Sequence, residues 1–423
     1  MKHAASIWRY AACWPRSPTT RPCSPPASRS SKGSMRPLRR DIAAVFVAKT
    51  VRTFSYGFLG IVLPLHLSDL GLGAVGVGAA VTLMLVGSAA LTWAIRRPAE
   101  RYGARAALVG LAGLSTLAAL LLLIAREPWL VILAAMLGNV AVGTGETGPF
   151  LTVEQVVVAR AVAAGQRTRM LSFYNLVGYA SAALGATLIG SVTTWRPLFV
   201  MFLAGSVLQA LAYRALPAAV TAPSRGGAGT PLVSAPIIRK LAALFALDSF
   251  GGGFVLQSLV AYFLHTRFAV DAATLGIAFA VAQVLTAISL LLAVPLAHRF
   301  GLLPTMVVSH LVSNVAVIAM AAAPTPAVAI ALLWARYLLS QMDVPTRQAY
   351  VMAVVEDRER EAAASMTNLA RTLAQAISPA VTGWVMQAVA LSAPFVLGGG
   401  VKIVYDLLLY ATFKDVKLRD EAR

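Results

Sequence analysis

Residues 96–125 read RRPAERYGARAALVGLAGLSTLAALLLLIA, a short charged segment followed by a long apolar run. An apolar run of about 20 residues forms a helix that crosses the ~30 Å hydrocarbon core of a bilayer. The whole chain has the same character, because 58% of its 423 residues are hydrophobic and only 13% are charged. Soluble proteins have about 25% charged residues, so the sequence predicts an integral membrane protein.

Apolar spans of this length recur along the chain with short polar breaks between them. Their number and spacing predict an all-α polytopic membrane protein with twelve transmembrane helices. The expected helices lie at about residues 42–66, 75–95, 104–125, 129–153, 168–190, 197–216, 238–264, 272–294, 302–323, 327–346, 362–389 and 393–413.

The net charge of +19 is concentrated in the first segment and in alternate loops. This distribution indicates membrane orientation, since basic loops stay on the cytoplasmic side, and it argues against a nucleic-acid-binding face. We therefore expect both termini in the cytoplasm, and the richness in alanine and arginine indicates a bacterial inner membrane. One side has Arg96, Arg97, Arg101, Arg105, Arg160, Arg167, Arg169, Arg214, Arg225, Arg239, Lys240, Arg299, Arg358, Arg360, Lys414, Lys417, Arg419 and Arg423, whereas the other has Arg126, Arg196 and Arg267.

The first 40 residues are expected to form a disordered basic tail. They are rich in Ser, Pro and Arg, and they lack the apolar stretch of about 7 to 15 residues that a secretory signal needs. Met35 is a second candidate for the true start of the protein. Both cysteines, Cys13 and Cys23, lie in this tail, so the apolar body has no thiol for a disulfide or a cysteine metal site.

The body of the chain divides into two similar halves. A linker at 217–236, rich in Pro, Gly and Ser, separates an expected bundle at 41–216 from one at 237–413, and a cytoplasmic tail follows at 414–423. Four sets of matching residues recur at offsets of 193 to 200, which indicates an internal repeat of the kind found in transporters. The matches include Gly76 with Gly276, Gly103 with Gly301, Pro149 with Pro345, and Asn175 with Asn368.

The loop between the second and third spans carries the most specific motif, Arg96-Arg97-Pro98-Ala99-Glu100-Arg101-Tyr102-Gly103-Ala104-Arg105. It is similar to the pattern Gly-x-Leu-Ala-Asp-Arg-x-Gly-Arg-Arg of the major facilitator superfamily, from which Arg96, Pro98 and Glu100 depart. The glycine permits a tight turn, and the acidic residue can meet a helix N-terminus or an arginine of the other half. The resemblance implies gating roles for Glu100, Arg101, Gly103 and Arg105.

The resemblance extends from residue 36 to the end of the chain and implies the fold of that superfamily, in which twelve helices form two pseudo-symmetric six-helix bundles. It also implies secondary active transport of a small molecule across the lipid bilayer by alternating access. Residues 64–72, at the outer end of the first helix, are similar to efflux members that export drugs or metabolites. The Gly-Pro pair of antiporters is missing from the fifth helix, so the motif does not indicate antiport.

Charges inside a span cost about 2.5 to 3.5 kcal/mol on insertion scales, so they indicate a cavity for substrate or ions. In the first helix Lys49, Arg52 and Tyr56 share one face, and for the two cations the alternative is snorkelling to the cytoplasmic surface. The repeat places Asp248 opposite Arg52, so these two are expected to pair across the cavity in one state. The three glycines at 251–253 indicate either a bend or close helix packing.

The tenth helix carries a polar stripe of Arg336, Ser340, Asp343 and Arg347 at positions i, i+4, i+7 and i+11. One interpretation is a structural ladder in which Asp343 neutralises Arg336 or Arg347. The other is that Arg336 and Asp343 contact substrate or a proton, while Arg347 and Gln348 belong to the cytoplasmic gate.

Further polar residues are expected in the fourth and eleventh helices. Glu146 is a candidate protonation site, whereas Glu154 is expected at the membrane interface. Asn368, Arg371 and Gln375 share one face of the eleventh helix, where they can line the cavity. Helix packing is the expected role of four residues on helices that stand outside the cavity in the resembling fold: His310, Asn314, Lys402 and Asp406.

These residues predict a proton-coupled transporter in which Glu146, Asp248 and Asp343 are the candidate proton acceptors. The cationic side chains favour an anionic or zwitterionic cargo, although an amphiphilic drug stays open, and full pairing of acids with arginines would favour a neutral cargo such as a sugar. The sequence has no nucleotide-binding loop, metal-ligand cluster or nucleophile triad, so we expect no ATP, no cofactor and no enzymatic activity. The alternative class is a membrane sensor or scaffold that kept the fold and lost transport.

Overall fold

The computed structural model describes residues 36–140, 148–162, 167–217, 235–355 and 360–415. Most of the expected basic tail and of the expected linker at 217–236 lies outside these ranges. Leu38–Arg423 forms one compact unit by its internal contacts. Within the described ranges the chain is helical and has no β-strand.

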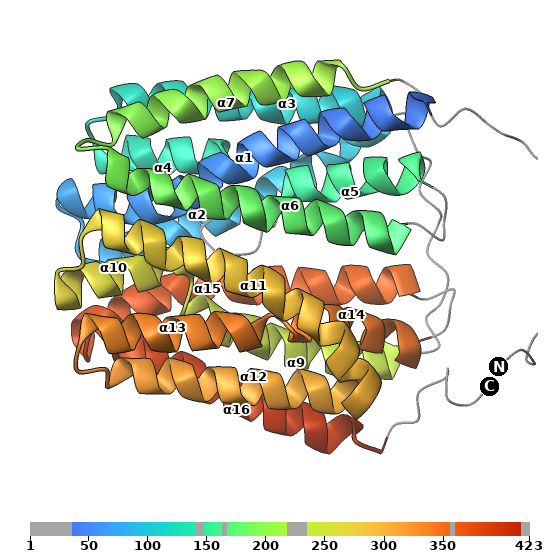
Figure 1. Cartoon of the computed structure of the whole chain (residues 1–423), viewed down its shortest axis with the longest axis vertical. Helices are drawn as coiled ribbons and strands as arrows, with labels where there is room; N and C mark the ends of the chain where they lie inside the picture. The colour runs from blue at the N-terminus through green and yellow to red at the C-terminus, as the bar shows by residue number, and fades with distance from the viewer. Residues whose placement is uncertain (1–35, 141–147, 163–166, 218–234, 356–359, 416–423) are drawn as a thin grey trace, which may run out of the picture. The chain divides into compact units, whose positions relative to one another are not determined.

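The first half of the described chain contains seven α-helices and a short 3-10 helix, which run back and forth alongside one another (Figure 1). Their bounds are α1 (Arg36–Asp69), α2 (Ala74–Ala94), α3 (Arg96–Ile124), α4 (Pro128–Leu137), α5 (Pro149–Ala161), α6 (Arg167–Thr187), η2 (Leu188–Ser191) and α7 (Arg196–Arg214).

The second half repeats this arrangement with eight described helices. Their bounds are α9 (Ala235–Gly253), α10 (Gln257–Phe268), α11 (Ala272–Phe300), α12 (Leu302–Ala321), α13 (Pro326–Ser340), α14 (Asp343–Val354), α15 (Arg360–Ala388) and α16 (Ala393–Phe413).

Eight helical stretches of the described chain are long and apolar enough to cross a membrane. One of them, Ala235–Phe268, joins α9 and α10 into a single span. We count the shorter helices in pairs, α4 with α5 and α13 with α14, and α6 together with η2, which follows it directly. Counted so, the described helices make twelve spans in two sets of six, which confirms the fold class that the sequence predicts.

The largest extensions beyond the predicted ends are in the fourth and tenth spans. The fourth was expected to end at residue 153, but α5 continues to Ala161, and the tenth was expected to end at 346, but α14 continues to Val354. Both α5 and α14 begin with a proline in their first turn, at Pro149 and Pro345. Proline suits this position because its missing N–H would have no helical partner there. In both the fourth and the tenth span a new helix therefore begins within the predicted range and continues beyond the end of the apolar run.

The seventh span is interrupted at the three glycines. Helix α9 ends at Gly253, and α10 starts only at Gln257. A methyl group added at Gly253 would overlap the Ser378 hydroxyl of α15, and one at Gly251 would press on Lys402 of α16. Both interpretations of the glycines are therefore correct: the helix breaks here, and neighbouring helices approach its backbone closely.

The internal repeat is visible in the backbone at its best-matched turn. Gly103 has φ 86° and ψ 163°, and Gly301, its partner in the second half, has φ 87° and ψ 162°. The preceding residues match as well, since Arg101 lies over the Tyr102 ring and Arg299 over the Phe300 ring, each at 5.3 Å from the ring centre. Only glycine adopts this backbone conformation readily, so the same residue is required in both halves.

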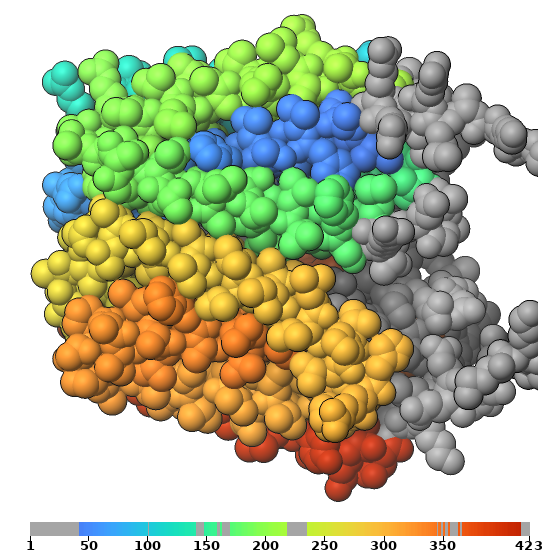
Figure 2. Space-filling view, viewed as in Figure 1, coloured from blue at the N-terminus to red at the C-terminus, as the bar shows by residue number. Residues whose placement is uncertain are grey.

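The two halves meet mainly through α2 against α15 and α6 against α11. The green and yellow surfaces of α6 and α11 lie directly against each other in Figure 2. At the first contact Gly78 and Gly383 allow backbone-to-backbone approach, and the Ala380 amide donates to Thr82 Oγ1 at 2.9 Å. At the second, Gly276 packs on the Ala186 carbonyl. These contacts are made by small residues and uncharged hydrogen bonds.

Helix α11 has a side-chain cap at its start. The Asp271 carboxylate accepts a hydrogen bond from the Thr274 amide at 3.4 Å. Hydrogen bonds from Thr274, first from its side chain and then from its amide, lower the pKa of Asp271, which lies outside the spans. Because the ionised carboxylate is the stabilising form, its contribution is present at neutral pH and is lost as the pH falls through the lowered pKa.

The matched glycine turns give a direct test of the repeat. We expect Gly103→Ala and Gly301→Ala each to destabilise the protein by about 1 to 3 kcal/mol, because a Cβ atom is strained in this backbone region. Gly110→Ala is the control, since Gly110 lies in α3 with open space around its Cα and alanine favours helix. Thermal unfolding of the detergent-purified variants measures the difference. Equal melting temperatures for all three variants would contradict the assignment.

Candidate functional site

The first half contains a buried ion pair between α1 and α5. Arg52 binds Glu154 through two hydrogen bonds, from Nη1 to Oε1 at 3.0 Å and from Nη2 to Oε2 at 2.6 Å. The Tyr213 hydroxyl of α7 accepts from Arg52 Nη1 at 2.6 Å and donates to Glu154 Oε1 at 2.6 Å. The Tyr174 hydroxyl of α6 donates to the other carboxylate oxygen. The bidentate geometry and the two tyrosine hydroxyls satisfy the hydrogen-bonding groups of an ion pair that is buried from solvent.

The other two predicted residues of α1, Lys49 and Tyr56, are also buried inside the first half. Lys49 is buried, with its ammonium 4.3 Å from the centre of the Tyr174 ring. The Tyr56 hydroxyl donates to the Gly138 carbonyl at 3.2 Å. Lys49 and Arg52 are both buried. Neither side chain reaches the surface, so the snorkelling alternative is wrong for both.

The second half contains a larger buried cluster around Asp248 of α9. Lys402 Nζ of α16 lies 2.5 Å from Asp248 Oδ1, and Arg347 Nη1 of α14 lies 3.3 Å from Asp248 Oδ2. The same Arg347 nitrogen lies 2.5 Å from Asp343 Oδ2. Asp343 thus neutralises Arg347 one turn away, which is one of the two ion pairs that the structural interpretation of the polar stripe predicts. The expected Arg52–Asp248 pair is absent from this structure, since each residue has a partner inside its own half.

The cluster continues from Asp248 into α12. His310 Nδ1 lies 2.7 Å from Asp406 Oδ1 of α16, and His310 Nε2 lies 3.6 Å from Asp248 Oδ1. Asn314 Nδ2 donates to the other oxygen of Asp406 at 2.9 Å. His310, Asn314 and Asp406 are each at most 3% exposed, so their polar groups depend on one another for hydrogen bonds.

Two predicted arginines are less buried than these clusters. Arg371 of α15 is half-buried, and its Nε donates to Ser249 Oγ at 3.0 Å, next to Asp248. Arg336 of α13 is half-buried, with its guanidinium 4.9 Å from the centre of the Tyr337 ring. Asn368 is exposed on α15. Glu146 lies outside the described residues, as do the side chains of Glu100 and Gln348.

Four residues of these clusters were assigned other roles by the sequence analysis. Glu154 was expected at the interface, but it is fully buried because α5 extends the fourth span beyond it. Helix packing was the expected role of Lys402, His310 and Asp406, yet they complete the charge cluster around Asp248. The missing signal was chemical: each charge inside a span needs a counter-charge, and these residues are the ones that supply it.

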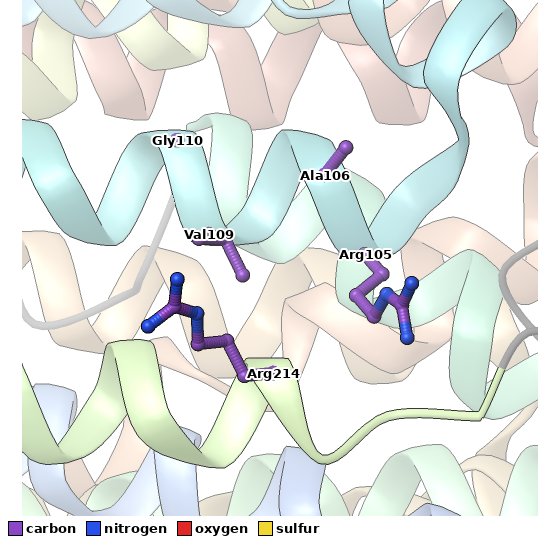
Figure 3. A pocket seen from close by; sticks show the side chains of 5 residues that line it. All are labelled: Arg105, Ala106, Val109, Gly110 and Arg214. Atoms are coloured by element: carbon purple, nitrogen blue, oxygen red, sulfur yellow. The ribbon is translucent and has the colours of Figure 1, made fainter.

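Four of the predicted gate residues belong to the turn at the start of α3, whereas Arg347 lies in the buried cluster of the second half. Arg101 and Arg105 are exposed, and Gly103 is buried at the turn. Arg105 and Arg214 border a hollow of about 580 Å³ between α3 and α7, which is floored by Ala106, Val109 and Gly110 (Figure 3). This hollow shares no residue with either charge cluster. Among the described residues, no group of His, Cys, Asp and Glu is arranged to hold a metal ion.

Comparison with known proteins supports the assignment that fold and motif suggest. The sequence model of the Major Facilitator Superfamily matches residues 45–339 and 241–422. The chain therefore belongs to the Major Facilitator Superfamily, a family of membrane transport proteins.

Individual relatives are similar over most of their length. An uncharacterized membrane protein of Saccharomyces cerevisiae is 22% identical over 89% of this chain and 95% of its own. The crystal structure of the nucleoside transporter NupG superposes with a TM-score of 0.67 at 14% identity, covering 89% of this chain and 99% of that one. A D-xylose–proton symporter superposes with a TM-score of 0.65 at 13% identity, covering 88% and 97%. At these identities the solved structures show the shared fold.

A double-mutant cycle tests the buried pair of the first half. We expect Arg52→Leu and Glu154→Leu each to destabilise the protein by about 3 to 5 kcal/mol, because each leaves an unpaired buried charge. The double variant should be less destabilised than either single variant, since it removes both charges. Unfolding in mixed detergent micelles measures the coupling, with exposed Arg105→Leu as control. Simple addition of the two single costs would show that the pair does not exist.

Proposed function

We propose that the protein is a secondary active transporter that moves a small organic anion or zwitterion by alternating access, coupled to protons. The family and the fold support transport in general. The anionic cargo is supported by one observation: among the described charges inside the spans, the carboxylates of Glu154, Asp248, Asp343 and Asp406 are all buried and paired, whereas Arg336 and Arg371 are only half-buried. The charge that a cargo can reach in the described part is therefore positive.

The same distribution of charges argues against the neutral cargo, such as a sugar, that the sequence analysis left open. A sugar-like cargo would be favoured if the acids of the spans neutralised the arginines and left little free charge. Arg52 and Arg347 are neutralised in this way, but Arg371 is held by the Ser249 hydroxyl, a neutral group. A guanidinium held by a neutral group keeps donors for a carboxylate or phosphate of the cargo.

The contacts between the halves fit a rocking motion. Small residues at α2–α15 and α6–α11 allow sliding, and both charge clusters stay inside their own half. We assign gating to the turn of Glu100, Arg101, Gly103 and Arg105 and to Arg347 with Gln348. Lys49, Tyr56 and Asn368, together with Arg52, Glu146 and Asp248, remain proposed members of the substrate and ion pathway.

The membrane placement follows from the basic residues. The helix ends on the side where α1 begins include Arg97 and Arg105 of α3, Arg239 of α9 and Arg299 of α11, all exposed. We propose that this end is cytoplasmic in a bacterial inner membrane, with bundles at 41–216 and 237–413 joined by the linker at 217–236 and with tails at 1–40 and 414–423. The similarity of residues 64–72 to efflux members favours export of a metabolite or drug. No enzymatic reaction is proposed.

The melting temperature of the purified protein tests this function with a panel of organic anions, amino acids, sugars and lipophilic cations. A ligand at a hundredfold excess over its Kd stabilises the folded state by about 2.7 kcal/mol. We expect an organic anion to raise the melting temperature, Arg371→Gln to abolish the rise, and Arg299→Gln, an exposed matched control, to preserve it. A shift by sugars alone would overturn the anionic cargo.

The same ligand must then cross the membrane in proteoliposomes, with a faster flux under a proton gradient. Binding without flux, or no response to any class, would favour the transport-inactive sensor or scaffold, to which the departures at Arg96 and Pro98 also point.

A further inference from the structure

The side chain of His310 lies between two carboxylates. Its Nδ1 faces Asp406 of α16 at 2.7 Å, and its Nε2 faces Asp248 of α9 at 3.6 Å. A neutral imidazole has one N–H donor and one acceptor lone pair, so the neutral form turns a lone pair toward one of the carboxylates. The doubly protonated ring can donate toward both. The geometry therefore fits an imidazole that carries an additional proton.

The charges around His310 lead to the same conclusion. The fully buried members of the cluster are three carboxylates, Asp248, Asp343 and Asp406, and two permanent cations, Arg347 and Lys402. An uncompensated charge in a protein interior is costly. One proton on His310 balances the buried set. Two other groups lie near His310. The ring centre of Tyr405 of α16 is 5.9 Å from that of the imidazole, and Arg371 of α15 donates to Ser249 but is half-buried.

Two acids of the cluster, Asp248 and Asp343, are less suited to take up a proton than His310. Asp248 lies against both Lys402 and Arg347, and Asp343 lies against Arg347. A carboxylate beside permanent cations is stabilised in its ionised form. Histidine, by contrast, changes its charge within the physiological pH range.

We propose that His310, held between Asp406 and Asp248, is the site where the coupling proton binds. This inference rests on the proposed proton-coupled transport and moves the proton from the candidate acids of the fourth, seventh and tenth spans, Glu146, Asp248 and Asp343, to the pair formed by α12 and α16. The residue belongs to a part of the second half that the sequence analysis assigned to packing.

The position of Asp248 provides the link to conformational change. Helix α12 packs along α16, so His310 and Asp406 stay together, whereas α9 contacts α15 and α16 and breaks at Gly253, just after Asp248. A shift of α9 at this break would separate Asp248 from His310 Nε2 and weaken proton binding. Two states that hold the proton with different affinity are what coupling requires.

Nitrogen-15 NMR of histidine-labelled full-length protein in lipid nanodiscs tests the site without any substrate. The signal that disappears in His310→Gln identifies His310. At about pH 7.5 we expect both ring nitrogens of His310 to carry protons, because each nitrogen faces a carboxylate. Asp248→Asn and Asp406→Asn should each give the neutral form at this pH. Asp271→Asn, outside the cluster, should leave the spectrum unchanged.

A neutral His310 in the unmodified protein at this pH would overturn the proposal, even if the aspartate variants fail to fold. An unchanged spectrum in well-folded Asp248→Asn would overturn the link to α9. Because no cargo is needed, these results are distinguishable from a failure of the proposed function: absent flux with a doubly protonated His310 refutes transport alone, and proton-driven flux with a neutral His310 refutes this site alone.

Discussion

The cost of an unpaired charge inside the hydrocarbon region is the constraint on which the rest of this structure depends. Each half of the protein meets it separately. In the first half Arg52 is neutralised by Glu154, and a tyrosine hydroxyl donates a further hydrogen bond to each carboxylate oxygen. In the second half Asp248 is neutralised by Lys402 and Arg347. The described contacts between halves can then be left to glycines and neutral hydrogen bonds, such as that from Ser258 to the Gly60 carbonyl. Among the described residues, no ion pair joins the two halves and opposes a movement between them.

The two halves are more alike in the arrangement of their helices than in their buried charged residues. The turn at Gly103 and Gly301 has the same backbone angles in both halves. The equivalent helices α1 and α9, however, carry opposite charges at Arg52 and Asp248, and each finds its partner on different neighbours. The first half uses α5, α6 and α7, whereas the second uses α12, α14 and α16. This divergence gives the second half a histidine between two acids, a group that the first half lacks among its described residues.

Much of the fold could be predicted from the sequence, because apolar length and charged loops directly reflect the bilayer. The twelve spans, the break at the glycines of 251–253 and the turn at Gly103 all follow from local composition. The partners of the buried charges could not be predicted, because they depend on which helices lie together. Glu154 looked interfacial since it follows an apolar run that a new helix in fact extends. Lys402 and His310 looked peripheral since the fold analogy placed their helices outside the cavity.

Alternating access is the central claim, and distances between spin labels test it most directly. The body of the chain has no cysteine, so only Cys13 and Cys23 need replacement. Labels at Phe173→Cys and Met366→Cys report the separation of the halves near the starts of α6 and α15, and labels at Ser191→Cys and Val389→Cys report it at the opposite end; all four positions are exposed. Between mildly alkaline and mildly acidic buffer, the account predicts that one distance lengthens while the other shortens. Distances that are unchanged at both ends, or that change in the same direction, would contradict it.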